Sequence, residues 1–361
     1  MNSRKNIYPD LIPKLERHQP LALATIIQAS GSTPQVAGAS AVFSEKGLVL
    51  GTLGGGIIEA DAQQRAFTAL QKKKSLFYEF RLQGDGSSEE EAVCGGSVAV
   101  LIDASPSWSL RAFVDLKESL RLRRAGILAT WIDVTPAGEA AIRRRWLDVA
   151  ASPENLAEWK PFLGEMEPAE ILRQGSPRLA KRTEKMEMAN ERSFLFLEPL
   201  YPLARLIIAG AGHVGRALAH LGKFLDFEVT VIDDRPEFAS LERIPEADAL
   251  IVADIGQALR DFPVFPDAYI VIVTRDHRHD AEALKACLRS TAAYIGMIGS
   301  ARKVALMREK FLEEGWATAA EFDRVHAPVG LRIGSKTVEE IALSIAAELV
   351  LARSRARGRQ A

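Results

Sequence analysis

The sequence has little cysteine and no long apolar run. Among its 361 residues there are two cysteines, Cys94 and Cys287, which is too few for a disulfide framework and is typical of a reducing compartment. The first residues contain no apolar core of a secretory signal, and no apolar stretch approaches the roughly 20 residues that span a bilayer. We therefore expect a cytoplasmic protein that does not enter the membrane.

A surplus of charge is also missing. The chain has 46 Lys+Arg against 47 Asp+Glu, a net charge of -1, so no global attraction to nucleic acid is expected. Hydrophobic residues make up 47% of the chain, which is enough for real cores, and the length indicates two or three domains. Near the C-terminus four arginines form a small basic tail, which we expect to be solvated: Arg353, Arg355, Arg357 and Arg359.

The most informative stretch is residues 206–234. An apolar run ends in a Gly-x-Gly-x-x-Gly turn formed by Gly210, Gly212 and Gly215. Apolar residues then recur at helical spacing, and a second strand pattern ends in Asp233 and Asp234. Strand, glycine turn, helix, strand and acid in this order predict a dinucleotide-binding unit.

Each part of this unit has an expected role in binding. The first glycine permits the tight turn, the second lets the backbone approach a pyrophosphate, and the third lets helix and strand pack closely. The helix start offers free N–H groups to phosphates, and Asp233 is placed to accept a ribose hydroxyl. Arg235 leaves the choice between NAD and NADP open. The alternative is a tight turn in a sheet that serves only as a scaffold.

Further strand patterns cover residues 249–254, 268–274 and 293–299. In an open parallel sheet, ligands lie beyond the carboxyl ends of the strands. His277, His279 and Asp280 follow one such end, but surface histidines near a helix start are commoner than metal ligands, so we predict no metal site. Cys287 is expected to be a buried core thiol. The candidate cofactor-binding residues of this region are Gly210, Gly212, His213, Gly215, Asp233, Asp234, Asp254, Thr274, Gly299 and Ser300.

The N-terminal third contains a second glycine cluster. Gly54, Gly55 and Gly56 open a helix that reaches about Lys72, so they form either an anion cradle or a loop without a ligand. An acidic loop ends at Cys94, Gly95 and Gly96, and the cysteine is either an accessible thiol or a small apolar residue at a strand start. Other expected elements are a helix over 5–18 that Pro13 disturbs, a strand over 21–27, a hairpin over 39–50, and strands over 76–82 and 97–102.

The middle of the chain offers no visible chemistry. We expect a helix over 108–124 and a strand over 127–134, while residues 150–190 are a solvated face or linker and 194–202 is an approach segment. The predicted domains are 1–103, an intermediate region 104–198, and 199–361. The fold class is α/β, with a C-terminal Rossmann-like parallel sheet and an N-terminal α+β domain.

Taken together, the motifs resemble the XdhC/CoxI family, the xanthine dehydrogenase accessory factors. The resemblance covers roughly residues 20–103 and 200–352. It implies that residues 1–103 form an XdhC/CoxI-type domain, and that the protein is an accessory protein rather than a turnover enzyme. It is carried by Gly31-Ser-Thr-Pro34, Gly51-Thr-Leu-Gly-Gly-Gly-Ile-Ile-Glu59, Cys94-Gly-Gly96, Ala209-Gly-Ala-Gly-His-Val-Gly215, Ala293-Tyr-Ile-Gly-Met-Ile-Gly-Ser300 and His326-Ala-Pro-Val-Gly330.

The resemblance also implies a cofactor and partners. Such proteins hold the molybdenum cofactor, in its molybdopterin form, while it receives a sulfido ligand from a cysteine desulfurase. They then help to insert it into an apo molybdenum hydroxylase of the xanthine dehydrogenase type. Gly54–Gly56 would anchor the phosphate, and Cys94, beside Gly95 and Gly96, would be the catalytic thiol. Many members carry a cysteine directly after the Gly-Gly-Gly run, where this chain has Ile57. The role of that thiol therefore passes to Cys94 or to no cysteine at all, and sulfuration is in question.

Two other functions compete with this one. The Rossmann motif also fits an NAD(P)-dependent oxidoreductase, for which His277 and His326 are acid–base candidates by their strand-end placement. It equally fits a nucleotide-sensing assembly protein without turnover. A homodimer is the default assembly, since symmetric dimers are the commonest.

Overall fold

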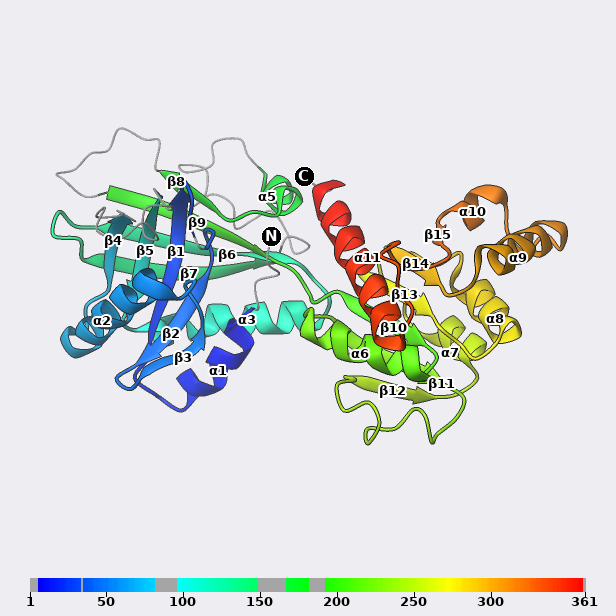
Figure 1. Ribbon diagram of the computed structural model, residues 1–361. Coiled ribbons are helices and arrows are strands. Elements are labelled where there is room, and N and C mark those ends of the chain that lie inside the picture. The colour runs from blue at the N-terminus through cyan, green and yellow to red at the C-terminus, as the bar shows by residue number, and fades with distance from the viewer. Residues whose placement is uncertain (1–5, 34, 82–95, 149–166, 182–191, 360–361) are drawn as a thin grey trace. The chain divides into compact units, whose positions relative to one another are not determined.

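The chain forms two units (Figure 1). The computed structural model describes residues 6–33, 35–81, 96–148, 167–181 and 192–359. The described residues up to Pro202 make the N-terminal unit, and Leu203–Arg359 makes the C-terminal unit. No helix among the described residues is both long enough and apolar enough to span a bilayer.

Two antiparallel sheets form the N-terminal unit. The first has the strand order β3-β2-β1-β5-β4 and the second β7-β6-β9-β8. Its strands are β1 (Ala22–Ser30), β2 (Ser40–Ser44), β3 (Gly47–Gly51), β4 (Leu76–Arg81), β5 (Ser97–Asp103), β6 (Gly126–Val134), β7 (Ala140–Asp148), β8 (Arg178–Lys181) and β9 (Arg192–Leu200). Its helices are α1 (Tyr8–Glu16), α2 (Gly56–Lys72), the 3-10 turn η1 (Pro106–Ser109), α3 (Leu110–Arg121) and α5 (Pro168–Gln174).

The sheets stack face to face between helices. Ile27 and Leu101 of the first sheet pack against Ile132 and Phe196 of the second. On the outer face of the first sheet, α2 buries Ile58 and its alanines. On the outer face of the second sheet, α5 contributes Ile171. β1, β6 and β9 are buried along most of their length, because one face of each strand packs in the core between the sheets and the other face in an outer core.

The first helix differs from its predicted form. Pro13 lies inside α1, which continues through it from Tyr8 to Glu16, although the sequence predicts that the proline disturbs the helix. The helix is held by burial, because Tyr8 and three other apolar side chains pack against α3. Tyr8 stacks on Phe113, with ring centroids 5.1 Å apart, and its hydroxyl donates to Glu198 at 2.7 Å. These contacts compensate for the backbone donor that proline lacks.

The prediction that residues 194–202 form only an approach segment is wrong, because most of them form a strand. Most of it belongs to β9, which pairs with β6 along its whole length. Six consecutive residues of β9 are buried, so the period-2 alternation that marks a strand is absent. Pro199 is tolerated because β8 pairs only with residues 194–197, which leaves the proline beyond the ladder on that side.

The C-terminal unit is built on one parallel sheet of the order β12-β11-β10-β13-β14-β15. The strand order reverses beside β10, since β11 lies on one side of it and β13 on the other. The strands are β10 (Arg205–Ala209), β11 (Glu228–Asp233), β12 (Ala249–Val252), β13 (Ala268–Ile272), β14 (Tyr294–Met297) and β15 (Val325–His326). The helices are α6 (His213–Phe224), α7 (Ile255–Asp261), α8 (His277–Cys287), α9 (Ala301–Glu313), α10 (Ala319–Asp323) and α11 (Val338–Arg359).

Helices cover both faces of this sheet, as Figure 1 shows. Leu206 and Ile208 of β10 pack with α6 and α11, whereas Ile207 and Ala209 pack with α7 and α8. The doubly covered parallel sheet confirms the predicted α/β class with a C-terminal Rossmann-like domain.

The arginines at the end of α11 are not all solvated, although their sequence pattern predicts a solvated tail. Arg353 is buried, donates to the carbonyl of Leu225 at 2.9 Å, and lies over the ring of Phe227. The guanidinium therefore satisfies a carbonyl just past the end of α6 and covers an aromatic ring at the same time.

Candidate functional site

The glycine turn lies at the switch in strand order, between β10 and α6. Gly210 has a φ of +117°, and a side chain there would bring Cβ to 2.5 Å from the carbonyl oxygen of Val273. A Cβ on Gly215 would lie 1.9 Å from the carbonyl oxygen of Gly210. At Gly212, by contrast, a Cβ would meet no atom within 4 Å. Two glycines are thus required by the protein itself, and the third faces open space.

The start of α6 offers unused backbone donors beside that open space. The N–H of Ala211 donates to Asp233 at 2.7 Å. The N–H groups of His213 and Val214 have no acceptor among the residues that the structure describes. A helix N-terminus with free N–H groups attracts anions such as phosphate.

Asp233 is fully engaged within the protein. Its Oδ2 accepts from Ala211 N and from Nη2 of Arg235 at 3.0 Å, and its Oδ1 accepts from N and Nε of Arg235 at 3.0 and 2.9 Å. These four bonds use the capacity of a carboxylate, and the residue is 1% exposed. Burial alone would raise the pKa of Asp233, but the bonds from Arg235 and Ala211 outweigh it and hold the pKa below the ordinary value. A ribose hydroxyl reaches Asp233 only by displacing one of these partners.

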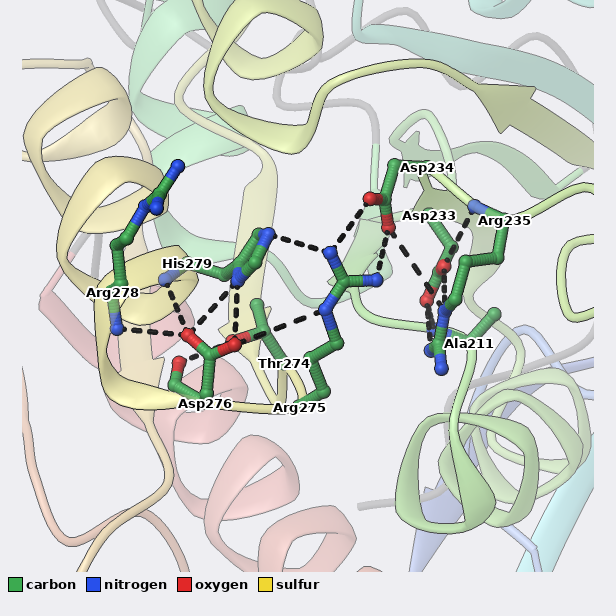
Figure 2. A network of polar contacts seen from close by, with 9 residues as sticks. All are labelled: Ala211, Asp233, Asp234, Arg235, Thr274, Arg275, Asp276, Arg278 and His279. Carbon is green, nitrogen blue, oxygen red and sulfur yellow. Dashed lines mark hydrogen bonds and ion pairs between the residues drawn. The ribbon is translucent and has the colours of Figure 1, made fainter.

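Asp234 is joined across the turn to Arg275 (Figure 2). Its two oxygens accept from Nη1 and Nη2 of Arg275 at 3.0 and 2.9 Å. Asp234 follows β11 and Arg275 follows β13, so this two-pronged pair connects the strands on either side of β10.

Arg275 is held from its other side by the start of α8. Its Nη2 donates to Nε2 of His279 at 2.8 Å, and Nδ1 of His279 contacts both oxygens of Asp276 at 2.9 Å. Because Arg275 can only donate, Nε2 accepts and Nδ1 carries the proton given to Asp276. Asp276 also caps α8, and the bonds from the side chain and backbone of His279 hold the pKa of its carboxyl well below its usual range.

Several other predicted residues serve as caps or internal braces. Thr274 donates to the fully buried Asp280 at 2.6 Å, and Lys303 pairs with Asp280 at 2.7 Å. Asp254 caps α7 through the N–H of Gln257, and Ser300 caps α9 through that of Lys303. A Cβ on Gly299 would meet only ordinary van der Waals contacts.

The histidines divide between exposed and braced positions. His213 lies exposed at the start of α6. His326 contacts Glu348 at 2.7 Å through Nδ1 and lies against the ring of Tyr294. Among the described residues, no group of three His, Cys, Asp or Glu side chains is arranged to hold a metal ion.

The glycine cluster of the N-terminal unit is filled by its own helix. Gly54, Gly55 and Gly56 all have positive φ values, of +104°, +70° and +58°. Oε2 of Glu59 accepts from the N–H of Leu53 at 2.8 Å and that of Gly55 at 3.4 Å. Partial burial would raise the pKa of Glu59, but bonds from Thr52, Leu53 and Gly55 lower it. A carboxylate already occupies part of the predicted anion cradle.

The thiol candidates are placed unequally. Cys94 and Gly95 lie outside the described residues. Gly96 packs against the loop after β1, because a Cβ there would lie 2.4 Å from the carbonyl oxygen of Ser32. Cys287 is buried in the core, and burial raises the pKa of its thiol to about 12. Ile57, directly after the three glycines, is 61% exposed.

The sequence pattern predicts Gly210, Gly212, Asp233, Asp234 and Thr274 at one edge of the sheet, and the structure places them there. The pattern does not single out Arg275 or Glu59. A signal existed for each: Arg275 directly follows a predicted strand-end residue, and Glu59 lies in the first turn of a predicted helix, where acids cap free N–H groups.

Comparison with known proteins agrees with this organisation. The model of the XdhC Rossmann domain matches residues 206–349, and that of the XdhC and CoxI family matches residues 14–81. The chain is 30% identical over 352 residues to a protein of Bacillus subtilis (strain 168) that is named as a probable xanthine dehydrogenase subunit. The match covers 97% of this chain and 98% of that one.

Two further similarities are partial or structural. The molybdenum cofactor insertion chaperone PaoD of Escherichia coli (strain K12) is 27% identical over 117 residues, or 30% of this chain and 36% of PaoD. The crystal structure of a protein from Bacillus halodurans, described as a xanthine dehydrogenase, superposes with a TM-score of 0.75 at 24% identity over 96% of both chains. Two models of the family match residues 14–81 and 206–349, and the match to the Bacillus subtilis protein spans nearly the whole of both sequences. The chain therefore belongs to the XdhC/CoxI family.

Proposed function

We propose that this protein is an accessory factor that binds the molybdenum cofactor and assists its insertion into a molybdenum hydroxylase of the xanthine dehydrogenase type. Membership of the XdhC/CoxI family and the similarity to an insertion chaperone support this role. The structural observation that carries it is the glycine turn, where Gly212 faces open space beside free N–H groups.

The residues of the turn fit a phosphate-bearing cofactor better than the N-terminal glycines do. At Gly54–Gly56 the N–H of Gly54 donates to Thr52 and that of Gly55 to Glu59, so a phosphate there has to compete with groups of the protein. At the C-terminal turn, the N–H of Ala211 is the one backbone donor of residues 211–214 that Asp233 takes. We therefore assign the phosphate of the cofactor, in its molybdopterin or nucleotide form, to the turn at Gly210–Gly215.

The finer parts of the proposal are sulfuration on Cys94, a cysteine desulfurase partner, a homodimer and a cytoplasmic location. These rest on the resemblance and on the sequence alone. NAD(P) binding at the same turn is the second candidate, because the strand order and the glycine turn are those of dinucleotide sites.

The test is reconstitution. Purified protein is incubated with molybdopterin, separated by gel filtration, and added to an apo xanthine dehydrogenase whose activity is then measured. We expect co-elution of the cofactor and faster activation than with free cofactor. Gly212→Ala, which fills the open space, lowers both the co-elution of the cofactor and the rate of activation. The matched control Gly256→Ala leaves these two quantities unchanged, because its Cβ meets no atom closer than 3.4 Å. Lack of co-elution with the unaltered protein refutes the role.

The variant Cys94→Ala distinguishes a role of the thiol in holding the cofactor from a role in its sulfuration. If the thiol takes part only in sulfur transfer, the variant binds cofactor like the unaltered protein but yields inactive hydroxylase. Full activation by the variant would rule out the thiol. Calorimetry with NADH tests the second candidate, since heat on titration without any turnover indicates a nucleotide-sensing role.

A further inference from the structure

The ion pair between Asp234 and Arg275 lies over the turn that the proposed ligand needs. One side of the turn is fixed to β11, because Asp233 accepts from Ala211. The other side is fixed to β13, because Gly210 packs against the backbone of Val273 and Thr274. Asp234 and Arg275 are the next residues on each side, and the pair between them (Figure 2) joins the two segments that flank the turn.

Both side chains of the Asp234–Arg275 pair are partly exposed to solvent. Arg275 is 38% exposed and Asp234 33% exposed, and an ion pair at such positions is weak compared with a buried one. Asp233, one residue earlier, is held by four bonds and does not move with Asp234. The hydrogen bonds that hold the turn among the described residues therefore do not involve the side chain of Asp234.

Arg275 keeps its position without Asp234. His279 accepts from Nη2 at 2.8 Å, and Asp276 lies 3.8 Å from Nε. His279 is in turn fixed by Asp276, which caps α8. Without Asp234, the guanidinium therefore keeps its place beside the turn and offers the two N–H groups, one on Nη1 and one on Nη2, that Asp234 had accepted. Phosphate oxygens match the planar guanidinium in the same two-pronged way as a carboxylate and carry more charge.

We propose that the Asp234–Arg275 ion pair is a gate across the glycine turn, which a pyrophosphate-bearing ligand opens by taking the guanidinium of Arg275 from Asp234. This inference rests on the proposed function, since it concerns the same site. It assigns opposite roles to the two partners: Asp234 competes with the ligand, and Arg275 binds it. A pair that merely stabilised the fold would give both substitutions the same sign.

The experiment is calorimetric titration of the full chain with ADP-ribose, and separately with inorganic pyrophosphate, which carries the charge without a nucleoside. Asp234→Asn removes the competing charge, and we expect about fivefold tighter binding of ADP-ribose. Arg275→Gln removes the phosphate partner, and we expect about tenfold weaker binding. Arg275→Lys keeps one contact with the phosphate, and its affinity for ADP-ribose lies between those of the unaltered protein and Arg275→Gln.

Matched controls lie next to the gate. Glu237→Gln loses the same charge three residues from Asp234, and Arg278→Gln does so three residues from Arg275. Neither side chain has a hydrogen bond or an ion pair among the described residues, and Glu237 adds only a weaker attraction to Arg235, which the control measures. Both controls are expected to bind ADP-ribose within about twofold of the unaltered protein.

Asp234→Asn with unchanged or weaker affinity overturns the gate, and so does the absence of binding in every variant. Melting temperatures establish that each variant is folded. The hydroxylase assay separates the two proposals. Activation without opposite affinity shifts refutes the gate alone, whereas opposite shifts without activation refute the accessory role alone. If pyrophosphate binds as tightly as ADP-ribose, the site recognises the phosphate groups and not the nucleoside.

Discussion

The two glycine turns of this protein open helices of similar kind and are completed in different ways. At Gly54–Gly56 the filling carboxylate comes from Glu59, within the first turn of α2. At Gly210–Gly215 the carboxylate is Asp233 on the neighbouring strand, and it leaves the start of α6 open. A glycine cluster at a helix start is therefore an anion site only when the protein has not supplied the anion itself.

The first way to sharpen this comparison is Gly215→Ala. The new Cβ would lie 1.9 Å from the carbonyl oxygen of Gly210, and neither backbone can yield without opening the turn. We expect the C-terminal unit to lose about 3 kcal/mol of its free energy of unfolding, measured by urea denaturation. An unchanged midpoint would show that the turn is more adaptable than its geometry indicates.

Asp233→Asn probes the carboxylate that the open turn relies on. The amide keeps the shape but loses the charge, and one of its two ends can no longer accept from Arg235. We expect a loss of about 2 kcal/mol at neutral pH, again from urea denaturation. Because the native pKa of Asp233 is depressed, this contribution is present above the unfolded pKa and fades only as pH falls through the lower native value. The variant and the unaltered protein therefore converge in stability in strong acid.

Glu59→Gln is the corresponding change in the closed turn. It removes the charge that faces the N–H groups of Leu53 and Gly55, and we expect the N-terminal unit to lose about 1 kcal/mol. The pKa of Glu59 is also lowered in the folded protein. The loss is therefore measurable at neutral pH and disappears as the pH falls through this lowered pKa. Glu79→Gln, an exposed acid on β4, provides the comparison, and an equal effect there would argue against a specific role for Glu59.

Gly212→Ala should have the smallest effect on stability and a clear effect on binding. Its φ of -66° suits any residue and its Cβ meets open space, so we expect a change within about 0.5 kcal/mol. ADP-ribose affinity should fall by about tenfold, because the methyl group occupies the space that the phosphates approach. A variant that binds as well as the unaltered protein would move the ligand away from this turn.

The sequence predicted the parallel sheet and the turn of the C-terminal unit because each element there has a local signal. The apolar run, the spaced glycines and the acid at the strand end all depend on neighbours in sequence. It did not predict that Asp233 would have no lone pair to spare, since that depends on the approach of Ala211 and on the side chain of Arg235 folding back.

Long-range contacts explain the other differences. β9 lacked the alternation of a half-buried strand because both of its faces are covered. Arg353 lies in a charged run and still becomes buried, because α11 brings it to the end of α6. Neither fact can be read from a local pattern, since each arises from elements far away in the chain.

The packing of α11 against β10 and α6 also bears on how the protein is made. Ala342, Ile345 and Leu349 share one core with Leu206 and Ile208. During synthesis the strand that begins the C-terminal unit emerges long before the helix that covers it. The N-terminal unit can fold as soon as its last strand, β9, leaves the ribosome. The core beneath the glycine turn, in contrast, is incomplete until α11 has been synthesised. Ribosomes stalled before residue 338 should therefore carry a folded N-terminal unit and a C-terminal unit that is still sensitive to protease.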